Sequence, residues 1–329
     1  MKEKMNRVQF REYDRTCCLP AKKALLMERA AFNLSDCRIC PRNCEKNRAG
    51  NARGFCLASG EKVMLSRAAL HFYEEPCISG TRGSGAVFFS GCSLRCLYCQ
   101  NLEISRMRIG RKVSVSRLSE IFLELQEKGA HNINLVTPTH YALQIREAVL
   151  ESRENGLSIP IVWNTSGYEK AETLAALSDI VDIYLTDFKY MDKKLAADFS
   201  MAPDYPERAK EALLEMLREK PRCVYDSEGM MQSGVIVRHL VLPGHVKNTR
   251  AVLAYLSGLG KEHFVLSLMS QYTPVRKIER YPELNRRLTK REYEKAVDAA
   301  LSLGFTDALI QEGGAAEESF IPAFDYEGV

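Results

Sequence analysis

The segment GAVFFSGCSLRCLYCQN, residues 85–101, decides how this sequence is interpreted. An apolar run typical of a buried β-strand leads directly into three cysteines, Cys92, Cys96 and Cys99, with the spacing C-x₃-C-x₂-C. Three thiolates this close in sequence can bind one metal cluster from one side. They leave the fourth position of a four-iron cluster without a protein ligand, and an open metal position is a place for chemistry.

The remaining cysteines also indicate metal binding. The chain has 11 cysteines, and all except Cys223 lie between Cys17 and Cys99. A disulfide framework would be spread through the fold, whereas clustered thiols in a reducing compartment more often bind metal. A closed, tetrahedral zinc at the triad Cys92, Cys96 and Cys99 would need a fourth ligand, for which Cys77 and His71 are candidates.

Composition restricts the class of protein. The 329 residues carry 46 basic and 42 acidic side chains, so the net charge of +4 gives no reason to expect nucleic acid as a partner. The N-terminal residues MKEKMNRVQFREYDRTCC lack the apolar region of a secretory signal. No run approaches the roughly 18 apolar residues that a membrane span needs. These features predict a cytoplasmic protein.

Apolar runs alternate with amphipathic helical segments over most of the chain. This alternation predicts an α/β fold with a parallel sheet, and six or seven βα units favour a partial (β/α)6-type barrel. An open doubly wound sheet is the alternative, and in both folds ligands bind at the carboxyl ends of the strands. We expect three parts, which are a cysteine-rich N-terminal extension (1–82), the barrel (83–311) and a C-terminal tail (312–329). The predicted strands are residues 85–91, 133–137, 159–167, 181–189, 234–244, 263–271 and 305–311.

The cysteine loop carries a family resemblance. The C-x₃-C-x₂-C motif with Tyr98 before its last cysteine resembles the signature of radical S-adenosylmethionine (SAM) enzymes, and FFSGC-x-LRC-x-YCQN resembles the branch around pyruvate formate-lyase activating enzyme. The resemblance implies a [4Fe–4S] cluster and SAM. It also implies an electron donor such as flavodoxin or ferredoxin, and a 5′-deoxyadenosyl radical that abstracts hydrogen from a substrate. A glycine of a partner glycyl-radical enzyme is one candidate substrate. The alternative class is a non-catalytic electron-transfer or metal-binding protein on the same fold.

The resemblance also implies cofactor-binding residues at successive strand ends. Any one of these polar residues could instead cap a turn or helix. One departure from the family is clear, because INLVTPTHY stands where a Gly-Gly-Glu motif usually receives the SAM amino group. Thr137 and His140 are expected at that position, without an acid. The full set of expected cofactor-binding residues is Tyr98, Thr137, His140, Asn164, Ser166, Asp187, Lys189 and Arg238, with Gln271 at the end of the sixth strand.

A second constellation precedes the barrel. Cys37, Cys40, Cys44 and Cys56 lie in CRICPRNCEKNRAGNARGFC, where C-x₂-C-x₃-C is followed by a fourth cysteine. Four thiolates could close a tetrahedral zinc site or ligate an auxiliary iron–sulfur cluster, and the sequence leaves both open.

Two weakly patterned segments have possible roles. Residues 214–234 end a predicted helix and then lose apolar periodicity, which would suit a lid at the mouth of the barrel. Residues 276–295 are charged on most faces and would suit a solvated loop or a docking surface for a protein partner.

Overall fold

A continuous, mostly parallel β-sheet forms the centre of the molecule. The computed structural model describes residues 32–60, 62–106, 109–311 and 322–329. Neighbouring parallel strands follow one another in the order β2-β4-β5-β6-β8-β9-β10. Their bounds are β2 Ser84–Phe89, β4 Ile133–Val136, β5 Ile161–Thr165, β6 Ile183–Asp187, β8 Met231–Leu240, β9 Val265–Met269 and β10 Leu309–Ile310.

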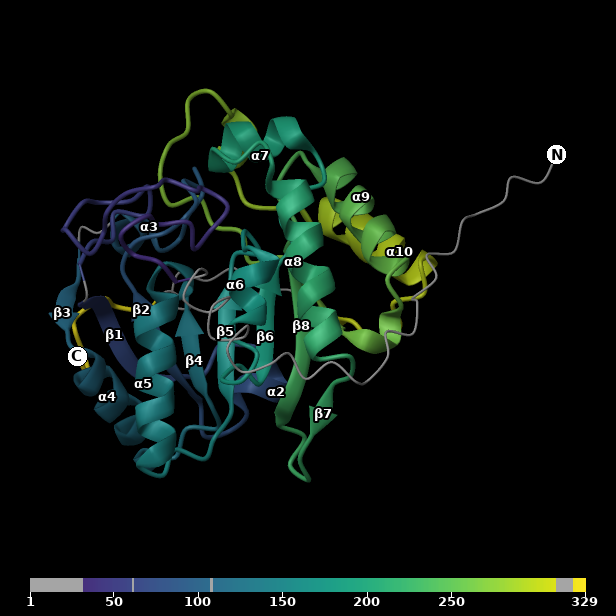
Figure 1. The fold of residues 1–329 in the computed structure, drawn as a ribbon. Helices are drawn as coiled ribbons and strands as arrows, with labels where there is room; N and C mark the ends of the chain where they lie inside the picture. The colour runs from purple at the N-terminus through teal and green to yellow at the C-terminus, as the bar shows by residue number, and fades with distance from the viewer. Residues whose placement is uncertain (1–31, 61, 107–108, 312–321) are drawn as a thin grey trace.

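This strand order confirms the predicted partial barrel. Each parallel strand lies beside the next parallel strand in the chain, so the order never reverses as it must in a doubly wound sheet. Figure 1 shows the connecting helices arranged along one face of the sheet. They are α4 Val115–Glu127, α5 Ala142–Glu154, α6 Ala171–Ala175, α8 Tyr205–Glu219, α9 Val246–Ser257 and α10 Lys290–Ser302.

The alternation of side chains along the strands divides the core into an outer and an inner layer. Ile161 and Trp163 belong to the large cluster that packs between the sheet and the helices. Val162 and Ile183 belong to a smaller cluster inside the barrel. The strands are buried on both faces, which explains why their sequences are continuous apolar runs.

An antiparallel edge extends the sheet before the first parallel strand. β1 (Val63–His71) pairs with β2 and with β3 (Arg111–Val113), so part of the predicted N-terminal extension belongs to the barrel's sheet. Because β1 runs against β2, it ends at the amino edge of the barrel, with His71 opposite Ser84. The short helix α2 (Pro76–Ser79) follows and packs Ile78 into the inner cluster. This segment therefore closes the bottom of the barrel.

The chain end returns to the same edge. The backbone N–H of Ala68 on β1 donates to the carbonyl oxygen of Glu327 at 2.8 Å. The rings of Phe324 and Phe88 meet with centroids 5.6 Å apart. Part of the predicted C-terminal tail, residues 312–321, lies outside the described residues.

Short elements mark the two ends of the barrel. The helices α3 (Leu102–Ser105) and α7 (Lys193–Ser200) lie at the carboxyl ends of the strands, near the segment 32–60, as Figure 1 shows. β7 (Val224–Tyr225) forms a hairpin with the beginning of β8 at the opposite end. The prediction of a lid at residues 214–234 is therefore wrong. Within the described ranges there are also 3₁₀ turns at Thr139–Tyr141, Lys261–His263 and Pro282–Asn285.

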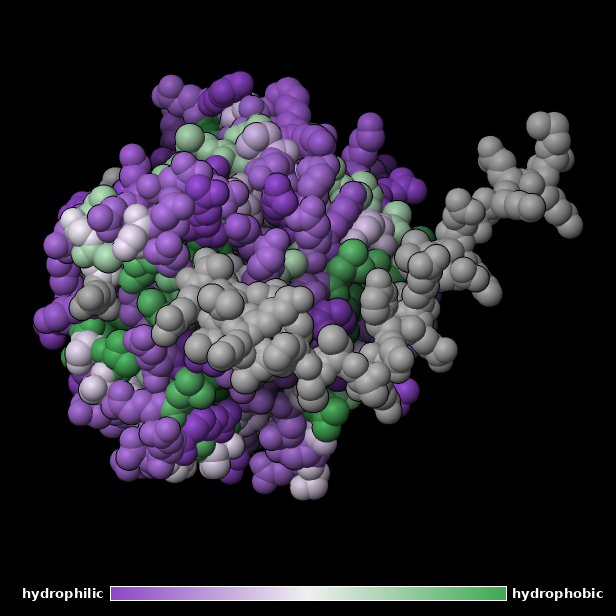
Figure 2. Space-filling view, viewed as in Figure 1, coloured by the Kyte–Doolittle hydropathy of each residue, from purple (hydrophilic) through white to green (hydrophobic). Residues whose placement is uncertain are grey.

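The surface is what a sheet covered by amphipathic helices should present. The face shown in Figure 2 is largely hydrophilic, with scattered hydrophobic residues. In the described part of the chain, no helix combines the length and the apolarity needed to cross a membrane.

Candidate active site

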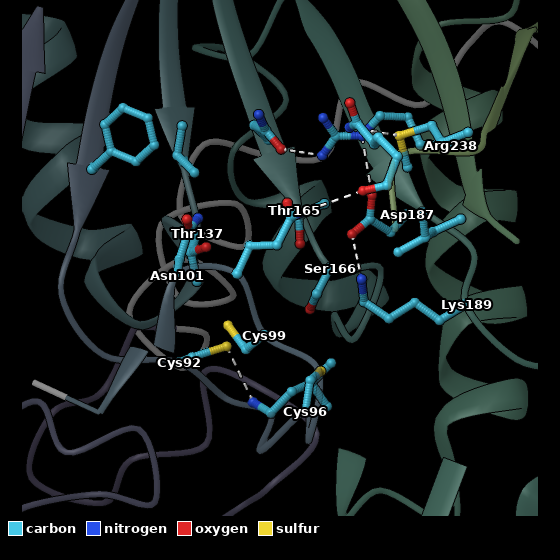
Figure 3. A pocket seen from close by; sticks show the side chains of 18 of the residues that line it. Cys92, Cys96, Cys99, Asn101, Thr137, Thr165, Ser166, Asp187, Lys189 and Arg238 are labelled. Atoms are coloured by element: carbon cyan, nitrogen blue, oxygen red, sulfur yellow. Dashed lines mark hydrogen bonds and ion pairs between the residues drawn. The ribbon is translucent and has the colours of Figure 1, made fainter. Parts of the chain in front are cut away.

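A pocket at the carboxyl ends of the strands brings together residues from most of the chain. Figure 3 shows the cysteines Cys92, Cys96 and Cys99 at one end of it and Arg238 at the other. All but one of the expected cofactor-binding residues line this pocket. Its lining includes Cys92, Cys96, Tyr98, Cys99, Thr137, Asn164, Ser166, Asp187, Lys189, Arg238 and Gln271.

The cysteine triad is half-buried and has the chemistry of a metal ligand set. Burial raises the pKa of the Cys92 thiol to about 12, and the neighbouring Cys96 and Cys99 add to this shift. The pKa of Cys99 is raised for the same reasons, burial first and Cys96 second. Thiols such as Cys92 and Cys99, whose ionisation is opposed by burial and by a neighbouring thiol, are stabilised as thiolates by a bound cation. In the described residues, no three His, Cys, Asp or Glu side chains are arranged to hold a single metal ion.

A chain of buried hydrogen bonds fixes the loop around Cys96. Its Sγ lies 3.0 Å from the hydroxyl of Ser200 on α7. That hydroxyl lies 2.8 Å from the hydroxyl of Tyr190, which in turn lies 2.5 Å from the hydroxyl of Tyr98. Tyr98 therefore lines the pocket and also ties the cysteine loop to the segment after β6.

A charged network forms the far end of the pocket. Lys189 donates to Asp187 at 2.5 Å, and Nε of Arg238 donates to the same carboxylate at 3.0 Å. Burial acts to raise the pKa of Asp187, but Lys189 and Arg238 outweigh it and hold that pKa below its ordinary value. Asp187 is therefore ionised, and the pair of cations around it remains charged.

Glu74 is a pocket residue that the sequence analysis missed. It follows β1 and enters the barrel from below. Its carboxylate accepts from Nη1 of Arg238 at 3.1 Å, from Asn134 at 3.0 Å and from Asn164 at 3.2 Å. The sequence HFYEEP (71–76) carries no signal for this position, because only the antiparallel direction of β1 brings Glu74 inside.

Thr137 has an unusual backbone conformation at the mouth of the pocket. Its φ of 60° lies in the left-handed region, which a β-branched residue rarely adopts. Its N–H donates to the carbonyl oxygen of Asn164 at 2.9 Å, which links the ends of β4 and β5. Strained residues of this kind cluster at functional sites, and Thr137 stands where the family's glycine-rich motif is expected.

A buried acidic residue, Glu169, lies next to the segment TPTH (137–140), which itself contains no acidic residue. The Glu169 carboxylate accepts from the hydroxyl of Thr139 at 2.5 Å and from the hydroxyl of Thr165. Burial raises the pKa of Glu169 to about 7, and these two hydrogen bonds oppose the shift. Because Thr165 lines the pocket, Glu169 influences the pocket through one hydroxyl.

His140 lies outside the pocket, contrary to the expectation from the sequence. Its ring is buried, and Nε2 lies 2.8 Å from the carbonyl oxygen of Ser90. Burial lowers the pKa of His140 to about 3, so the ring is neutral and donates one hydrogen bond to this carbonyl. His140 therefore supports the backbone just before Cys92.

The ends of β5 and β6 approach each other closely beside Ser166. Gly167 has φ +76°, and a Cβ there would lie 2.2 Å from the carbonyl oxygen of Asp187. Tyr205 bridges the two ends, since its hydroxyl donates to the carbonyl oxygen of Ser166 at 2.8 Å and accepts from the N–H of Lys189 at 3.0 Å. Any residue other than glycine at 167 would force these pocket walls apart.

The four cysteines of the N-terminal segment also lie together. Burial raises the pKa of Cys40, and the nearby Cys56 and Cys37 add to the shift. Burial likewise raises the pKa of Cys56, with Cys37 and Cys44 as further causes. These mutual influences place the four thiols in one electrostatic group, separate from the triad.

Comparison with known families identifies the fold and its chemistry. The model of the radical SAM superfamily matches residues 86–256, more than half of the chain. The chain belongs to this superfamily. Radical SAM membership implies a [4Fe–4S] cluster and SAM, and the three thiols that line the pocket with an open side suit such a cluster.

Two relatives from Methanocaldococcus jannaschii align with most of this radical SAM chain. The uncharacterized protein MJ0674 is 29% identical over 309 residues, which cover 90% of this chain and 84% of the relative. The uncharacterized protein MJ0808 is 26% identical over 274 residues, covering 77% of this chain and 73% of the relative.

Two solved structures align with part of this chain. Streptococcus suis SuiB bound to S-adenosylmethionine aligns with a TM-score of 0.43 and 13% identity, over 68% of this chain and 45% of SuiB. A radical SAM methyltransferase from Sphaerobacter thermophilus aligns with a TM-score of 0.45 and 14% identity, over 69% of this chain and 66% of that chain. This chain thus spans less than half of the SuiB chain.

Proposed function

We propose that this protein is a radical SAM oxidoreductase of the activating-enzyme type, and that the pocket holds SAM between the cysteine triad and Arg238. One observation carries the proposal, which is that the triad and seven of the eight expected cofactor-binding residues line the same pocket. When bound, the [4Fe–4S] cluster supplies one electron that splits SAM into methionine and a 5′-deoxyadenosyl radical, which takes a hydrogen atom from the substrate.

The polar strand ends have separate roles in this proposal. Lys189, held by Asp187, offers a cation to the SAM carboxylate. Thr165 donates its hydroxyl hydrogen bond to Glu169 and accepts from the N–H of Gly167 at 3.4 Å, so one oxygen lone pair is left to accept from the SAM amino group. Acting through the hydroxyl of Thr165, Glu169 thereby takes the place of the acid that the family's Gly-Gly-Glu motif would provide.

Titration with SAM separates this enzyme from a protein that only transfers electrons. The anaerobically reconstituted and reduced protein should show an electron paramagnetic resonance signal that changes when SAM is added, because SAM binds to the open iron. Cys223→Ala, which removes a cysteine outside both groups, should keep the response, and Cys96→Ala should lose it. A reduced cluster that ignores SAM in wild type supports the electron-transfer alternative.

The finer proposal is that the substrate is a glycine of a partner glycyl-radical enzyme. The FFSGC-x-LRC-x-YCQN resemblance supports it. The segment after β9 also supports it, because Gln271 lines the pocket while Arg276 and Lys277, further along, are exposed. These cations could dock an acidic surface of the partner, or of a flavodoxin or ferredoxin that donates the electron. Cross-linking of wild type and of Arg276→Glu/Lys277→Glu to a candidate partner tests the docking surface.

A second candidate is a small polar substrate bound below SAM. The observation that favours it is the charged far end of the pocket, where Glu74, Arg238 and Asp187 converge. Such groups recognise a molecule that carries both a carboxylate and a hydrogen-bond donor. Transfer of deuterium from labelled amino acids into 5′-deoxyadenosine would favour this candidate, whereas a glycyl radical on a protein partner would favour the first.

A further inference from the structure

We propose that Cys37, Cys40, Cys44 and Cys56 ligate a second iron–sulfur cluster that is independent of the triad. The proposed reaction uses only the triad Cys92, Cys96 and Cys99, so it leaves this second group of thiols without a role. We call the four N-terminal cysteines the quartet. Cys37, Cys40 and Cys56 are buried and Cys44 is half-buried, and none of them forms a disulfide in the described residues.

The backbone around the quartet passes close to the thiols and has an unusual conformation. A Cβ on Gly54 would lie 3.3 Å from Sγ of Cys44 and also 3.3 Å from Sγ of Cys56, so the chain passes close to both sulfur atoms. Asn43 and Glu45, on either side of Cys44, have φ of 41° and 50°. Non-glycine residues adopt the left-handed region at a cost, so a functional constraint is expected here.

A buried cation beside the quartet requires an anion. Arg48 is fully buried, and Nη1 lies 3.5 Å from Sγ of Cys37. Its Nη2 donates to the carbonyl oxygen of His140 at 2.7 Å, while Nε has no hydrogen-bond partner in the part of the chain that the structure describes. No carboxylate among those residues forms an ion pair with Arg48. Buried charges in proteins are paired, and four metal-bound thiolates provide the negative charge that four neutral thiols lack.

The quartet is attached directly to the loop of the triad. Phe55, which precedes Cys56, accepts from Nη2 of Arg95 through its carbonyl oxygen. Nη1 of the same guanidinium donates to the carbonyl oxygen of Cys92 at 2.7 Å. Arg42, between Cys40 and Cys44, donates to the carbonyl oxygen of Ser93 at 2.7 Å.

These contacts favour iron–sulfur over zinc at the quartet. The guanidinium of Arg95 donates to the carbonyl oxygens of both Phe55 and Cys92, so one side chain joins the loops of the two cysteine groups. An iron–sulfur cluster can change its oxidation state, so a direct connection to a second centre that must be reduced suits electron transfer. A zinc ion does not change its charge and would make no use of this connection. The C-x₂-C-x₃-C spacing is also close to those of cluster-binding proteins.

Iron, acid-labile sulfide and zinc contents of anaerobically reconstituted full-length variants test the proposal. Cys92→Ala/Cys96→Ala/Cys99→Ala should keep about four irons and four sulfides per chain, with a signal that SAM does not change. Cys37→Ala/Cys40→Ala should also keep about four irons and four sulfides per chain, and its electron paramagnetic resonance signal should change when SAM is added. Wild type should hold about eight. Its reduced spectrum should be broadened by magnetic interaction between the two clusters, and the spectrum of neither variant should be.

Three results would overturn the proposal. One is a triad variant that folds, as judged by circular dichroism, but holds no iron. Another is a wild type that holds about one zinc per chain, when the Cys37→Ala/Cys40→Ala variant holds none. The third is an unbroadened wild-type spectrum with only four irons. Cys77→Ala/Cys223→Ala is the matched control, because both residues pack at the opposite end of the barrel and should leave all contents unchanged. A triad that fails to respond to SAM while the quartet holds iron contradicts the proposed function alone.

Discussion

Nη1 of Arg238 lies 3.1 Å from Oε2 of Glu74, a residue 164 positions earlier in the chain. The two meet because β8 carries Arg238 along one wall of the barrel, while the segment after β1 enters from below. Asp187 and Asn164 occupy the other nitrogens of the guanidinium, at 3.0 and 2.6 Å. The charged end of the pocket is thus built around one arginine.

Replacing this arginine should damage both stability and activity. Arg238→Gln leaves Glu74 and Asp187 close together without their shared cation, and breaking a buried ion pair costs about 3–5 kcal/mol. Denaturant unfolding under anaerobic conditions measures this loss. The exposed Arg208, which pairs with Glu211, is the control, and Arg208→Gln should change stability by less than about 0.5 kcal/mol. Equal effects of the two substitutions would contradict the network described here.

The raised pKa of Glu169 predicts a specific pH dependence. Between about pH 4.5 and pH 7 the folded protein keeps a proton on Glu169 that the unfolded chain has released. The contribution of Glu169 to the free energy of unfolding is fully present at low pH and is lost as the pH rises through 7. The loss is about 3 kcal/mol, since one pKa unit corresponds to about 1.4 kcal/mol. The free energy of unfolding of Glu169→Gln should therefore rise relative to that of wild type between pH 5 and pH 8. Glu127→Gln, at the exposed end of α4, should follow wild type, and a parallel course for Glu169→Gln would refute the assignment.

Thr137 should respond differently to two substitutions. Thr137→Gly removes the cost of a left-handed conformation, about 1–2 kcal/mol, and loses about 0.5–1 kcal/mol to chain entropy, so the melting temperature should rise slightly. Thr137→Val keeps the branched side chain and should give no gain. If the hydroxyl contacts SAM, both variants should bind SAM more weakly. Equal melting temperatures for glycine and valine at this position would mean that the backbone is not strained.

His140 is predicted to hold the cysteine loop and not SAM. His140→Leu removes the hydrogen bond to the Ser90 carbonyl and leaves that buried acceptor unsatisfied, at a cost of about 1–3 kcal/mol. Iron retention after gel filtration should fall, while the SAM dissociation constant of the protein that keeps its cluster should change less than about threefold. A tenfold loss of SAM affinity with normal iron content would restore the role expected from the sequence.

The sequence predicted those parts of the site that depend on one strand and its following loop. Cys92, Asn164 and Asp187 each come directly after an apolar run, and parallel strands bring such positions to one edge. The triad and the partial barrel could therefore be inferred from spacing and periodicity, whereas the cofactor-binding residues at the strand ends were expected from the resemblance to radical SAM enzymes.

The missed residues depend on chain directions that periodicity does not encode. Glu74 reaches the pocket because β1 is antiparallel, and nothing in VMLSRAALH shows its direction. His140 faces the Ser90 carbonyl because a 3₁₀ turn follows Thr137, and so it rotates away from the mouth. Glu169 acts through Thr139 and Thr165, a relation that exists only once β4 and β5 are neighbours.

Formation of 5′-deoxyadenosine tests the central claim most directly. Anaerobically reconstituted wild type with SAM and dithionite should yield 5′-deoxyadenosine and methionine in equal amounts, as measured by liquid chromatography. Cys96→Ala should yield neither, and Cys223→Ala should match wild type. Wild type that holds a full cluster at the triad, binds SAM and still forms no 5′-deoxyadenosine would contradict the claim.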